Sequence, residues 1–453
     1  MKYKLKPHQI QAINSFEEND NIGVLEMATG TGKTIIALEI VARNFEARGR
    51  QFLIIIVPFL HLIDQWVEKF PLYGIKNYLK IAEGKTGWQK RLEKRVWDYK
   101  FGFRDRVVLI GSYKSIGSDH FQKIISEVDN NRFLVADECH NLGSGLYKDS
   151  LFSEFECRLG LSATPRRWFD EKGTKRIYDV FNKTVYEYGL GQAIKDEILT
   201  PYDYHPCIIS LNDDEIASYE ELSKKIGRIM NMETSKKADI DYLEKLTRDR
   251  ANIIKCADEK LPMMLQLLKN QKDKRFTLVY CAPGQIDLIV EAIYSLGINV
   301  HRFNSELNSR ERQKILDHFA KGEIEVLVAI KCLDEGVDVP ATRVAYFMAS
   351  SSNPKEFVQR RGRVLRRSIG KEKSVLFDFV TLQKELHPTI FESIVKRELP
   401  RYAEFVDLAD NKYSSEVRQN LLKMLSAFGL EKYLYLKPWE VYEMMLKEES
   451  YYD

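Results

Sequence analysis

Two stretches of the chain alternate short apolar runs with segments of helical period. They span residues 22–161 and 276–379. The runs are almost continuous in Ile, Leu and Val, as expected of parallel strands that are covered on both faces. The segments between them, such as Ile35–Arg48 and His61–Phe70, show the spacing of amphipathic helices. The pattern predicts the strands Ile22–Met27, Phe52–Val57, Val107–Ile110, Phe133–Ala136, Arg158–Leu161, Phe276–Cys281, Ile298–Phe303, Val326–Ile330, Val344–Phe347 and Val375–Phe379.

This alternation predicts βαβ units and therefore an α/β fold with two tandem, doubly wound domains, each built on a parallel sheet. Between them the chain becomes rich in Lys and Glu, and Leu211–Glu215 has the character of a helix start. We expect a helical insertion there, which would be either a solvated linker or a functional element, and a short helical tail at the end. The predicted boundaries are 1–200 for the first domain, 201–272 for the helical linker or insertion, 273–383 for the second domain and 384–453 for the C-terminal extension.

Composition narrows the class of protein. The 453 residues carry 69 Lys and Arg against 66 Asp and Glu, a net charge of +3, which excludes a histone-like polycation and an acidic disordered tail. Nucleic-acid binding stays possible, because it depends on where charge is placed. The longest apolar run, Phe52–Leu60, is interrupted by Pro58 and is too short to span a bilayer. We expect a cytoplasmic protein with no membrane association.

The six cysteines are scattered and contain no Cys-x-x-Cys pair, which favours reduced thiols over a disulfide framework or a zinc site. Cys139 next to His140 suggests a metal ligand pair, but no further ligands stand at suitable spacing.

A candidate phosphate-binding loop, Ala28–Thr34, lies between a predicted strand and a predicted helix. Small residues at a helix N-terminus allow backbone N–H groups to surround phosphates. Lys33 would contact the β- and γ-phosphates, and the Thr34 hydroxyl would bind Mg²⁺. Met27 stands where the usual pattern has its first glycine, and a purely structural turn is the alternative. The loop residues expected to bind ATP are Thr29, Gly30, Thr31, Gly32, Lys33 and Thr34.

A second candidate lies at the end of the run Phe133–Ala136, where Asp137 and Glu138 follow directly. The carboxyl ends of parallel strands are where ligands bind in such sheets. Asp137 would hold the metal, and Glu138 would orient and deprotonate an attacking water. The alternative is an ordinary solvated turn at the end of a strand.

Seven motifs in this order give the chain a clear resemblance to the superfamily 2 helicases and translocases, over roughly residues 5–380. They are Leu5–Gln9, the phosphate loop, Val57–Leu60 with Gln65, Asp137–His140, Ser162–Thr164, Glu335–Pro340 and Gln359–Arg366. The resemblance implies two RecA-like domains that bind ATP and Mg²⁺ between them.

The same resemblance implies roles for individual residues. Gln9 would read the adenine edge, while Arg363 and Arg366 would act as arginine fingers that stabilise charge on the transferred phosphoryl group. Arg361 and Arg367 could instead belong to a basic, solvated helix face. Gly336 and Asp338 would belong to the nucleotide site, and the residues expected to couple ATP hydrolysis to strand movement are His140, Ser162, Thr164 and Gln359.

The variant motifs resemble those of the xeroderma-pigmentosum-B-type repair helicases and the restriction-enzyme motor subunits. Asp-Glu-Cys-His replaces Asp-Glu-Ala-Asp, Gln359 opens the last motif, and Leu159–Pro165 fits that group. Arg166–Asp170 stands where the repair proteins have an Arg-Glu-Asp triplet. This resemblance implies a DNA substrate.

Family members hold the sugar–phosphate backbone along a path across both domains, largely without reading bases. By resemblance, the path would include the segment around Cys281–Pro283, and the insertion stands where the repair family has a strand-gripping protrusion. A basic stretch, Lys85–Arg95, with Trp88 and Trp97 interleaved would either bind a strand or form a solvated amphipathic helix. The expected contacts to nucleic acid are Pro58, Phe59, Gln65, Ser112, Tyr113 and Lys331.

The leading hypothesis is an ATP-dependent DNA helicase or translocase that works in repair, restriction or phage defence. An RNA helicase or remodeller is one alternative. Another is an ATP-gated DNA-binding subunit that recruits a nuclease or other effector. A protein partner is expected because the two domains occupy nearly the whole chain.

Overall fold

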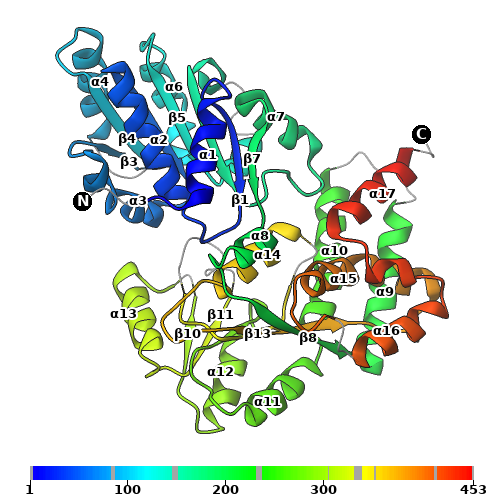
Figure 1. Ribbon diagram of the computed structural model, residues 1–453. Helices are drawn as coiled ribbons and strands as arrows, with labels where there is room; N and C mark the ends of the chain where they lie inside the picture. Colours follow the sequence, from blue (N-terminus) through cyan, green and yellow to red (C-terminus); the bar gives the residue numbers. More distant parts are fainter. Residues whose placement is uncertain are drawn as a thin grey trace. The chain divides into compact units, whose positions relative to one another are not determined.

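The computed structural model describes residues 4–82, 87–144, 151–230, 237–304, 306–330, 339–350, 353–412 and 416–450. The chain divides into two compact units, Met1–Leu199 and Thr200–Asp453 (Figure 1). Each unit contains one parallel β-sheet flanked by helices. The predicted fold class, two α/β domains with parallel sheets, is confirmed.

The first unit has a seven-stranded sheet in the order β3-β4-β2-β5-β6-β1-β7, and its neighbouring strands are parallel. Its strands are β1 (Ile22–Met27), β2 (Gln51–Val57), β3 (Leu79–Ile81), β4 (Arg106–Ser112), β5 (Arg132–Asp137), β6 (Cys157–Ser162) and β7 (Thr184–Tyr188). Its helices are α1 (Pro7–Glu17), α2 (Lys33–Arg48), α3 (Leu60–Val67), α4 (Trp88–Lys100), α5 (Tyr113–Ile116), α6 (Asp119–Ile125), α7 (Glu171–Phe181) and α8 (Leu190–Lys195), with short 3₁₀ turns at Phe70–Tyr73, Cys139–Gly143 and Leu151–Glu154.

Burial explains why this sheet is so apolar. Every residue of β2 is buried, because helices cover both faces of the sheet. Phe52, Ile54 and Ile56 pack with residues of α4, α6 and α7 in one core cluster. Helices α1 and α2 contact the strands β1, β2 and β7 as well as each other.

The second unit has a six-stranded parallel sheet in the order β10-β11-β9-β12-β13-β8. Its strands are β8 (Tyr202–Ile209), β9 (Thr277–Tyr280), β10 (Val300–Phe303), β11 (Val326–Ala329), β12 (Val344–Phe347) and β13 (Ser374–Thr381). Its helices are α9 (Asp213–Met230), α10 (Lys237–Cys256), α11 (Lys260–Asn270), α12 (Ile286–Tyr294), α13 (Ser309–Ala320), α14 (Pro354–Val364), α15 (Pro388–Asp407), α16 (Glu416–Ser426) and α17 (Pro438–Ser450), with a 3₁₀ turn at Glu431–Leu434.

Helices α11 and α12 pack on one face of this sheet through a cluster that includes Met264 and Ile289. On α14 and α15, Phe357 and Phe405 pack against each other and Phe405 also meets Phe347 of β12, with ring centroids 5.6 and 5.7 Å apart. The predicted C-terminal extension therefore contributes directly to the packing of the second unit.

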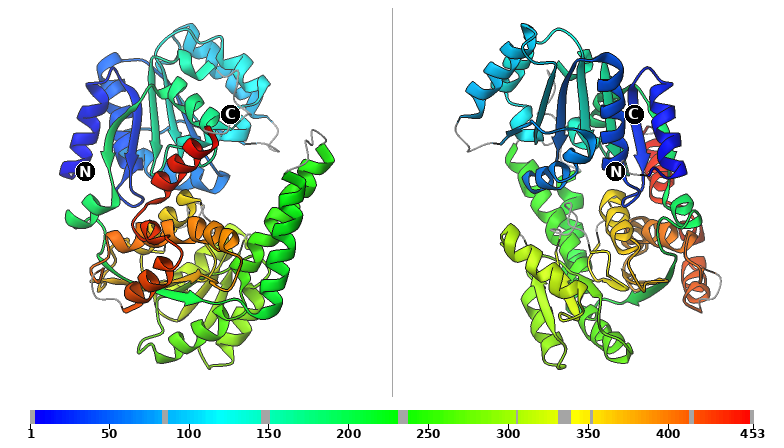
Figure 2. Two further views of the ribbon diagram at one scale, coloured as in Figure 1. Left: turned by 90° about the vertical axis from the view of Figure 1, so that its right-hand side faces the viewer. Right: turned by 60° about the vertical axis from the view of Figure 1, so that its left-hand side comes forward.

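Helices α9 and α10 run side by side as a long pair (Figure 2). Arg250 of α10 lies 5.6 Å from the ring centre of Tyr219 on α9, while exposed ion pairs such as Lys225–Glu221 line the outer surface. The pair is therefore a mostly solvated helical element with a small buried seam.

All ten predicted strands are present, but β3, β7 and β8 were not predicted. β3 has only three residues, which is too short for an apolar pattern. β8 contains Pro206, which suggests a non-strand, yet β8 pairs only with β13 and such an edge position tolerates proline. The expectation of a helical segment from residue 201 is therefore wrong at its start, since the helical part begins with α9.

Within the described residues, no helix is both long and apolar enough to cross a membrane. Cys139, Cys157, Cys207, Cys256 and Cys281 are free thiols. The same part of the chain contains no cluster of three or more His, Cys, Asp and Glu side chains that could hold a metal ion.

Candidate active site

The carboxyl ends of three adjacent strands bring the predicted catalytic motifs of the first unit together. β6 lies between β5 and β1, and the register pairs Glu26 with Ser162 and Asp137 with Leu161. The phosphate loop, which follows Met27, therefore starts beside the ends of β5 and β6. Residues that are far apart in the sequence thus share one sheet edge.

The phosphate loop has a conformation that requires glycine. Gly30 and Gly32 have φ angles of 86° and 92°, and a Cβ on Gly32 would lie 2.4 Å from Gln9 Nε2. Thr31 Oγ1 donates to the Ala28 carbonyl at 2.7 Å, and Lys33 Nζ donates to the Met27 carbonyl at 2.9 Å. The loop is therefore held in place from within, directly before the N-terminus of α2, where backbone N–H groups can bind an anion.

Helix α1 holds the loop from the outside. Gln9 is buried; its Oε1 accepts a hydrogen bond from Lys6 N at 2.9 Å, and its Nε2 donates to the Thr31 carbonyl at 3.4 Å. His8 Nε2 lies 3.0 Å from the same Thr31 oxygen, and its ring stacks on Tyr188 at 4.5 Å. The structure therefore places Gln9 against the phosphate loop, and its contact with adenine stays a prediction.

A cavity of about 680 Å³ lies beside α1 and was not foreseen from the sequence. One side of it has the stacked rings of His8, Tyr188 and Tyr186, and Tyr188 donates to Asp196 Oδ2 at 2.8 Å. Flat aromatic surfaces with polar groups at the rim suit a heterocyclic base. The cavity is lined by Lys6, Pro7, His8, Gln11, Tyr186, Glu187, Tyr188, Gln192, Asp196 and Ile198.

The two acids at the end of β5 are held differently. Asp137 accepts hydrogen bonds from Trp66 Nε1 at 3.0 Å and from the Glu138 backbone N–H at 3.1 Å. Burial and the neighbouring Glu138 raise the pKa of Asp137 to about 6, although the charge of Lys33 opposes this. Glu138 has a left-handed backbone with φ 49°, and its enclosed Oε2 has no hydrogen-bond donor in the described part of the chain. A pair of adjacent acids at the carboxyl edge of a parallel sheet, one with an enclosed oxygen that accepts no hydrogen bond within the described residues, fits a cation and a water.

A short chain of contacts connects these acids to the motif at the end of β6. His140 Nδ1 lies 3.5 Å from Glu138 Oε2 and 3.1 Å from Ser162 Oγ. Ser162 Oγ in turn accepts from the Thr164 backbone N–H at 3.1 Å. Arg167, which sequence reasoning did not select, donates to the His140 carbonyl at 2.8 Å. The three predicted coupling residues of this unit are therefore in one network with Glu138.

The predicted nucleic-acid contacts of the first unit divide into two groups. Phe59 and Gln65 are exposed and Pro58 is half-buried, so all three can reach a ligand. Ser112 and Tyr113 are buried instead: the Ser112 side chain caps α5, and the Tyr113 hydroxyl donates to the Asp137 carbonyl at 2.8 Å. Tyr113 therefore supports the acid site and Ser112 the start of α5, and their contact with nucleic acid stays a prediction. Tyr113 anchors the end of β5, a role that its place after a strand did not reveal.

In the second unit, helix α14 carries the last motif. Gln359 and Arg363 are buried. Arg361 is 1% exposed and binds the Glu404 carboxylate at 2.6 Å and the Glu404 carbonyl at 2.7 Å, which excludes the alternative of a solvated face for this residue. Arg367 is exposed, and burial lowers the pKa of Arg366 to about 10. Lys331, Gly336 and Asp338 lie outside the described residues.

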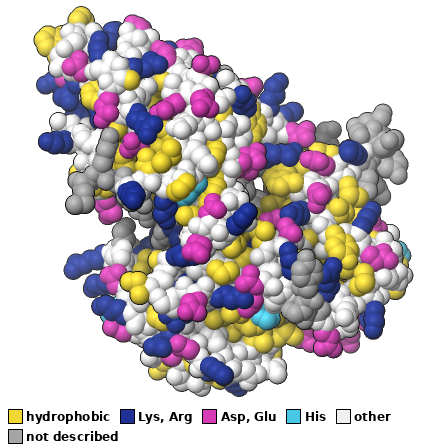
Figure 3. Space-filling view, viewed as in Figure 1, with side chains coloured by type: hydrophobic (Ala, Val, Ile, Leu, Met, Phe, Trp, Pro, Cys, Tyr) yellow, Lys and Arg dark blue, Asp and Glu magenta, His cyan; other side chains and the backbone are white. Residues whose placement is uncertain are grey.

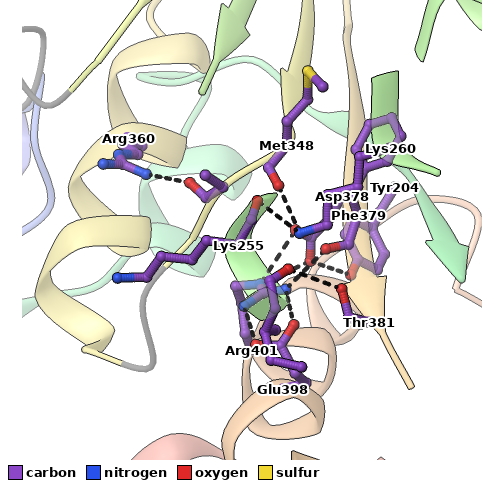
Figure 4. A network of polar contacts seen from close by, with 12 residues as sticks. Tyr204, Lys255, Lys260, Met348, Arg360, Asp378, Phe379, Thr381, Glu398 and Arg401 are labelled. Atoms are coloured by element: carbon purple, nitrogen blue, oxygen red, sulfur yellow. Dashed lines mark hydrogen bonds and ion pairs between the residues drawn. The ribbon is translucent and has the colours of Figure 1, made fainter. Parts of the chain in front are cut away.

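A buried network of charged side chains lies next to this helix (Figure 4). Arg401 of α15 binds Asp378 of β13 at 3.0 Å and Glu398 at 2.9 Å, and Tyr204 donates to Asp378 at 3.0 Å. Lys260 at the start of α11 donates to the Met348 carbonyl at 2.9 Å. The adjacent carbonyl, of Ala349, accepts from Arg360 of α14 at 2.9 Å, so the network is close to the last motif.

Comparisons with known proteins agree with this architecture. Residues 2–167 match the family described as type III restriction enzyme, res subunit, and residues 259–368 match the helicase conserved C-terminal domain. The chain belongs to the superfamily 2 helicases and translocases, which are ATP-hydrolysing enzymes.

Three individual proteins show how this chain compares with known members of the superfamily and with solved structures. The DNA 3′-5′ translocase XPB2 of Sulfurisphaera tokodaii is 25% identical over 402 residues, which cover 84% of this chain and 82% of that protein. The type I restriction enzyme EcoAI endonuclease subunit of Escherichia coli is 29% identical over 208 residues, 43% of this chain and 23% of that subunit. The DNA-bound type ISP restriction–modification enzyme LlaBIII superposes with a TM-score of 0.60 at 15% identity, over 96% of this chain and 33% of that enzyme. The last likeness concerns the fold alone.

Proposed function

We propose that this chain is an ATP-driven translocase that moves along DNA. The observation that carries the proposal is the arrangement at the end of β5, where two adjacent acids lie beside a preformed phosphate loop and connect to Ser162 through His140. The similarity to the XPB2 translocase over most of both chains supports DNA as the track.

The residues at this edge fit ATP and a divalent cation. The N-terminus of α2 and Lys33 would bind the phosphates, while Thr34 and Asp137 would hold Mg²⁺, which neutralises charge on the phosphates when bound. The enclosed Thr29 Oγ1, which has no partner in the described part of the chain, is a further group available to the nucleotide.

The chemistry then assigns a task to each residue. Glu138 accepts a proton from water while the water oxygen forms a bond to the γ-phosphorus, and the bond to the bridging oxygen breaks to release ADP. His140, which lies between Glu138 and Ser162, reports the state of the phosphate site to the end of β6. Arg363, Arg366 and Gln359 would complete the site as fingers and as a coupling residue.

We assign residues 1–200 to the nucleotide-binding domain and residues 273–383 to the second RecA-like domain. The α9–α10 pair, within the insertion, would contact the nucleic acid, and its solvated surface with little buried seam supports a role outside the core. Residues 384–453 would serve as a brace for the second domain.

Steady-state ATPase assays test the proposal with single-stranded DNA, duplex DNA and RNA as separate activators, and with Lys33→Ala as the inactive control. Stimulation by DNA, together with ATP-dependent displacement of a third strand from a DNA triplex, is the expected result. Stimulation by RNA alone would instead support an RNA remodeller. Displacement that depends on a 3′→5′ orientation of the track would match the polarity in the name of the XPB2 relative.

A recruiting subunit is the second candidate, and the restriction-enzyme relatives, of which this chain covers about a quarter to a third, favour it. Such a protein would bind DNA with ATP present and hydrolyse it, yet would leave the triplex intact until a nuclease or other effector is added.

A further inference from the structure

Three large aromatic side chains are exposed together at the end of α4. Trp97, Phe101 and Phe103 have exposed fractions of 53%, 61% and 72%. The Trp97 ring stacks on Phe103 with centroids 5.4 Å apart and planes within 7°, and lies 4.8 Å from Phe101. Figure 3 shows hydrophobic side chains at this tip of the first unit, with Lys and Arg side chains close by. Exposed apolar surface of this kind is uncommon without a ligand.

The backbone fixes this arrangement in advance. After α4, Gly102 adopts a φ of 78°, and the backbone N–H groups of Phe103 and Arg104 donate to the Asp98 carbonyl at 2.8 and 3.1 Å. This turn folds Phe103 back over Trp97. The aromatic platform is therefore preorganised, which lowers the entropic cost of binding a ligand.

Positive charge is concentrated at the same place. Between residues 88 and 106 there are seven Lys and Arg against three Asp and Glu, a surplus of four, whereas the whole chain has a net charge of +3. Burial lowers the pKa of Arg95, and the charges of Arg104 and Arg91 lower it further. Arg95 Nη1 and Arg104 Nε are enclosed and make no hydrogen bond within the described residues. The other contacts of these groups are few: Arg95 Nη2 donates to the Tyr78 carbonyl at 3.1 Å, and Arg104 lies 4.0 Å from the Asp98 carboxylate. Guanidinium groups that repel one another and keep donors unused favour an anion.

The helix geometry places these two features side by side. Arg91 and Arg95 are one helical turn apart, and Lys94 and Trp97 form a neighbouring row at i, i+3 spacing. Lys94 and Trp97 are both exposed, whereas Trp88 is buried in the core. The helix thus offers phosphate-binding groups next to faces on which bases can stack.

We propose that this surface, the α4 patch formed by Arg91, Arg95, Trp97, Phe101, Phe103 and Arg104, is a second nucleic-acid site that binds single strands. Stacking on aromatic rings needs unpaired bases, and every base has a suitable face, so the site is selective for single strands and tolerant of sequence. The guanidinium groups contact the phosphates. A single-stranded nucleic acid has phosphates for the guanidinium groups and unpaired bases for the aromatic rings.

The α4 patch is distinct from the ATP site. The turn after α4 leads into the amino end of β4, where Asp105 accepts from the Gln51 N–H at the start of β2 at 2.9 Å. The phosphate loop and Asp137 are at the opposite, carboxyl edge, and three strands (β2, β5 and β6) lie between β4 and β1 in the sheet order. A strand bound at the patch would therefore be held apart from the motor track, as suits a displaced or trailing single strand.

Photocrosslinking locates the site without reference to ATP hydrolysis. Nucleotide-free protein is irradiated with single-stranded DNA that contains 5-iodouracil, and in a parallel arm with the corresponding RNA, and the crosslinked peptides are sequenced. We expect crosslinks at Trp97 or Phe103, and a yield at least about tenfold lower in the W97A/F103A double variant, given a stacking contribution of about 1–3 kcal/mol per base. Competition by unlabelled single strands and not by blunt duplex is the expected pattern.

Tyr294→Ala is the matched control, since Tyr294 on α12 is 73% exposed, as Phe103 is, and belongs to the other unit. Trp97→Phe should keep the crosslink, because it retains a ring at the same place. In addition, Arg104→Ala should reduce the dependence of crosslinking on salt. Absence of crosslinks from residues 88–106 in both arms, or an unchanged yield in W97A/F103A, would overturn the proposal, whether or not the chain proves to be a motor.

Discussion

Two pairs of carboxylic acids in this molecule lie on or beside a buried parallel strand, and the pairs differ in how the nearest positive group contacts them. Asp378 and Glu398 in the second unit share one guanidinium, that of Arg401, at distances of 3.0 and 2.9 Å. Asp137 and Glu138 in the first unit have the amine of Lys33 nearby, but that amine donates to the Met27 carbonyl. Burial raises the pKa of both aspartates. The charge and hydrogen bonds of Arg401 oppose this at Asp378, whereas at Asp137 the charge of Lys33 and the hydrogen bonds from Trp66 and the Glu138 N–H oppose it.

The difference separates a structural pair from a functional one. A buried charge that has its counter-charge and hydrogen bonds holds elements together, and here it joins β8, β13 and α15. Asp137 accepts hydrogen bonds from Trp66 and the Glu138 N–H but no directly bonded guanidinium, and its pKa is raised to about 6. Acids with raised pKa values at a strand end are candidates for functional sites. The contrast therefore supports the proposal that the end of β5 is the reactive place, with the Arg401 network as a support.

The largest expected effect is on Glu138. Glu138→Gln should lower ATP turnover at least about 100-fold, because the attacking water loses its base. The free energy of unfolding should stay the same or rise slightly, since the change removes a negative charge beside Asp137. Turnover by phosphate release and urea unfolding of the same preparation measure both. Unchanged turnover would remove Glu138 from the mechanism.

Removal of Arg401 from the buried network should instead lower the free energy of unfolding. Arg401→Met leaves Asp378 and Glu398 buried without their guanidinium, and we expect a loss of about 3–5 kcal/mol in the free energy of unfolding of the second unit. Arg302→Met is the control, because it removes an exposed ion pair with Asp287 and should cost about 0–1 kcal/mol. Equal losses in urea titrations of the two variants would contradict the assignment of the network.

The pH dependence of the free energy of unfolding tests the protonation state of Lys260, which lies in the same network. Burial lowers the pKa of this lysine from 10.5 to about 8. Between pH 8 and 10.5 the unfolded chain then binds the proton that the folded chain has lost, so the stability of the wild type rises with pH relative to that of Lys260→Met. The gain should reach about 2–3 kcal/mol at the top of this range and be absent below pH 8. Parallel stability curves for the two proteins would show that Lys260 does not titrate in this way.

The smallest expected effect concerns the phosphate loop. Gly32 and Gly49 flank the two ends of α2 with positive φ angles, but only at Gly32 would a Cβ meet another group, Gln9 Nε2 at 2.4 Å. Gly49→Ala should cost about 1 kcal/mol from backbone conformation alone. Gly32→Ala should cost more, about 2 kcal/mol, and should also weaken ATP binding. Equal destabilisation with unchanged nucleotide affinity, measured by calorimetry, would argue against the contact with Gln9.

The sequence predicted the framework well because parallel, buried strands must be apolar over their whole length. Runs such as Phe52–Val57 and Phe133–Ala136 are apolar over their whole length for this reason. β8 was not predicted because it contains Pro206, which is tolerated in an edge strand. The proposed site residues could be selected in the same way, since phosphate binding and water activation need particular side chains at particular strand ends; their roles stay predictions.

Contacts between distant segments could not be predicted in the same way. Arg361 and Arg363 belong to one basic run, yet only the fold shows Arg361 bound to Glu404 of α15. Tyr113 follows a strand like a track residue, but its hydroxyl anchors the Asp137 carbonyl. His8 and Tyr188 are far apart in sequence and become one stacked pair only because β7 is next to β1.

The sequence alone thus determined the fold class and the family, because both depend on residue types at short, regular spacing. The tertiary structure decided which buried charges have partners, which aromatic rings are exposed beside α4, and which side chains line the cavity next to α1. These properties depend on which strand lies beside which, and on the free energy of burying each charge, which is a property of the whole fold.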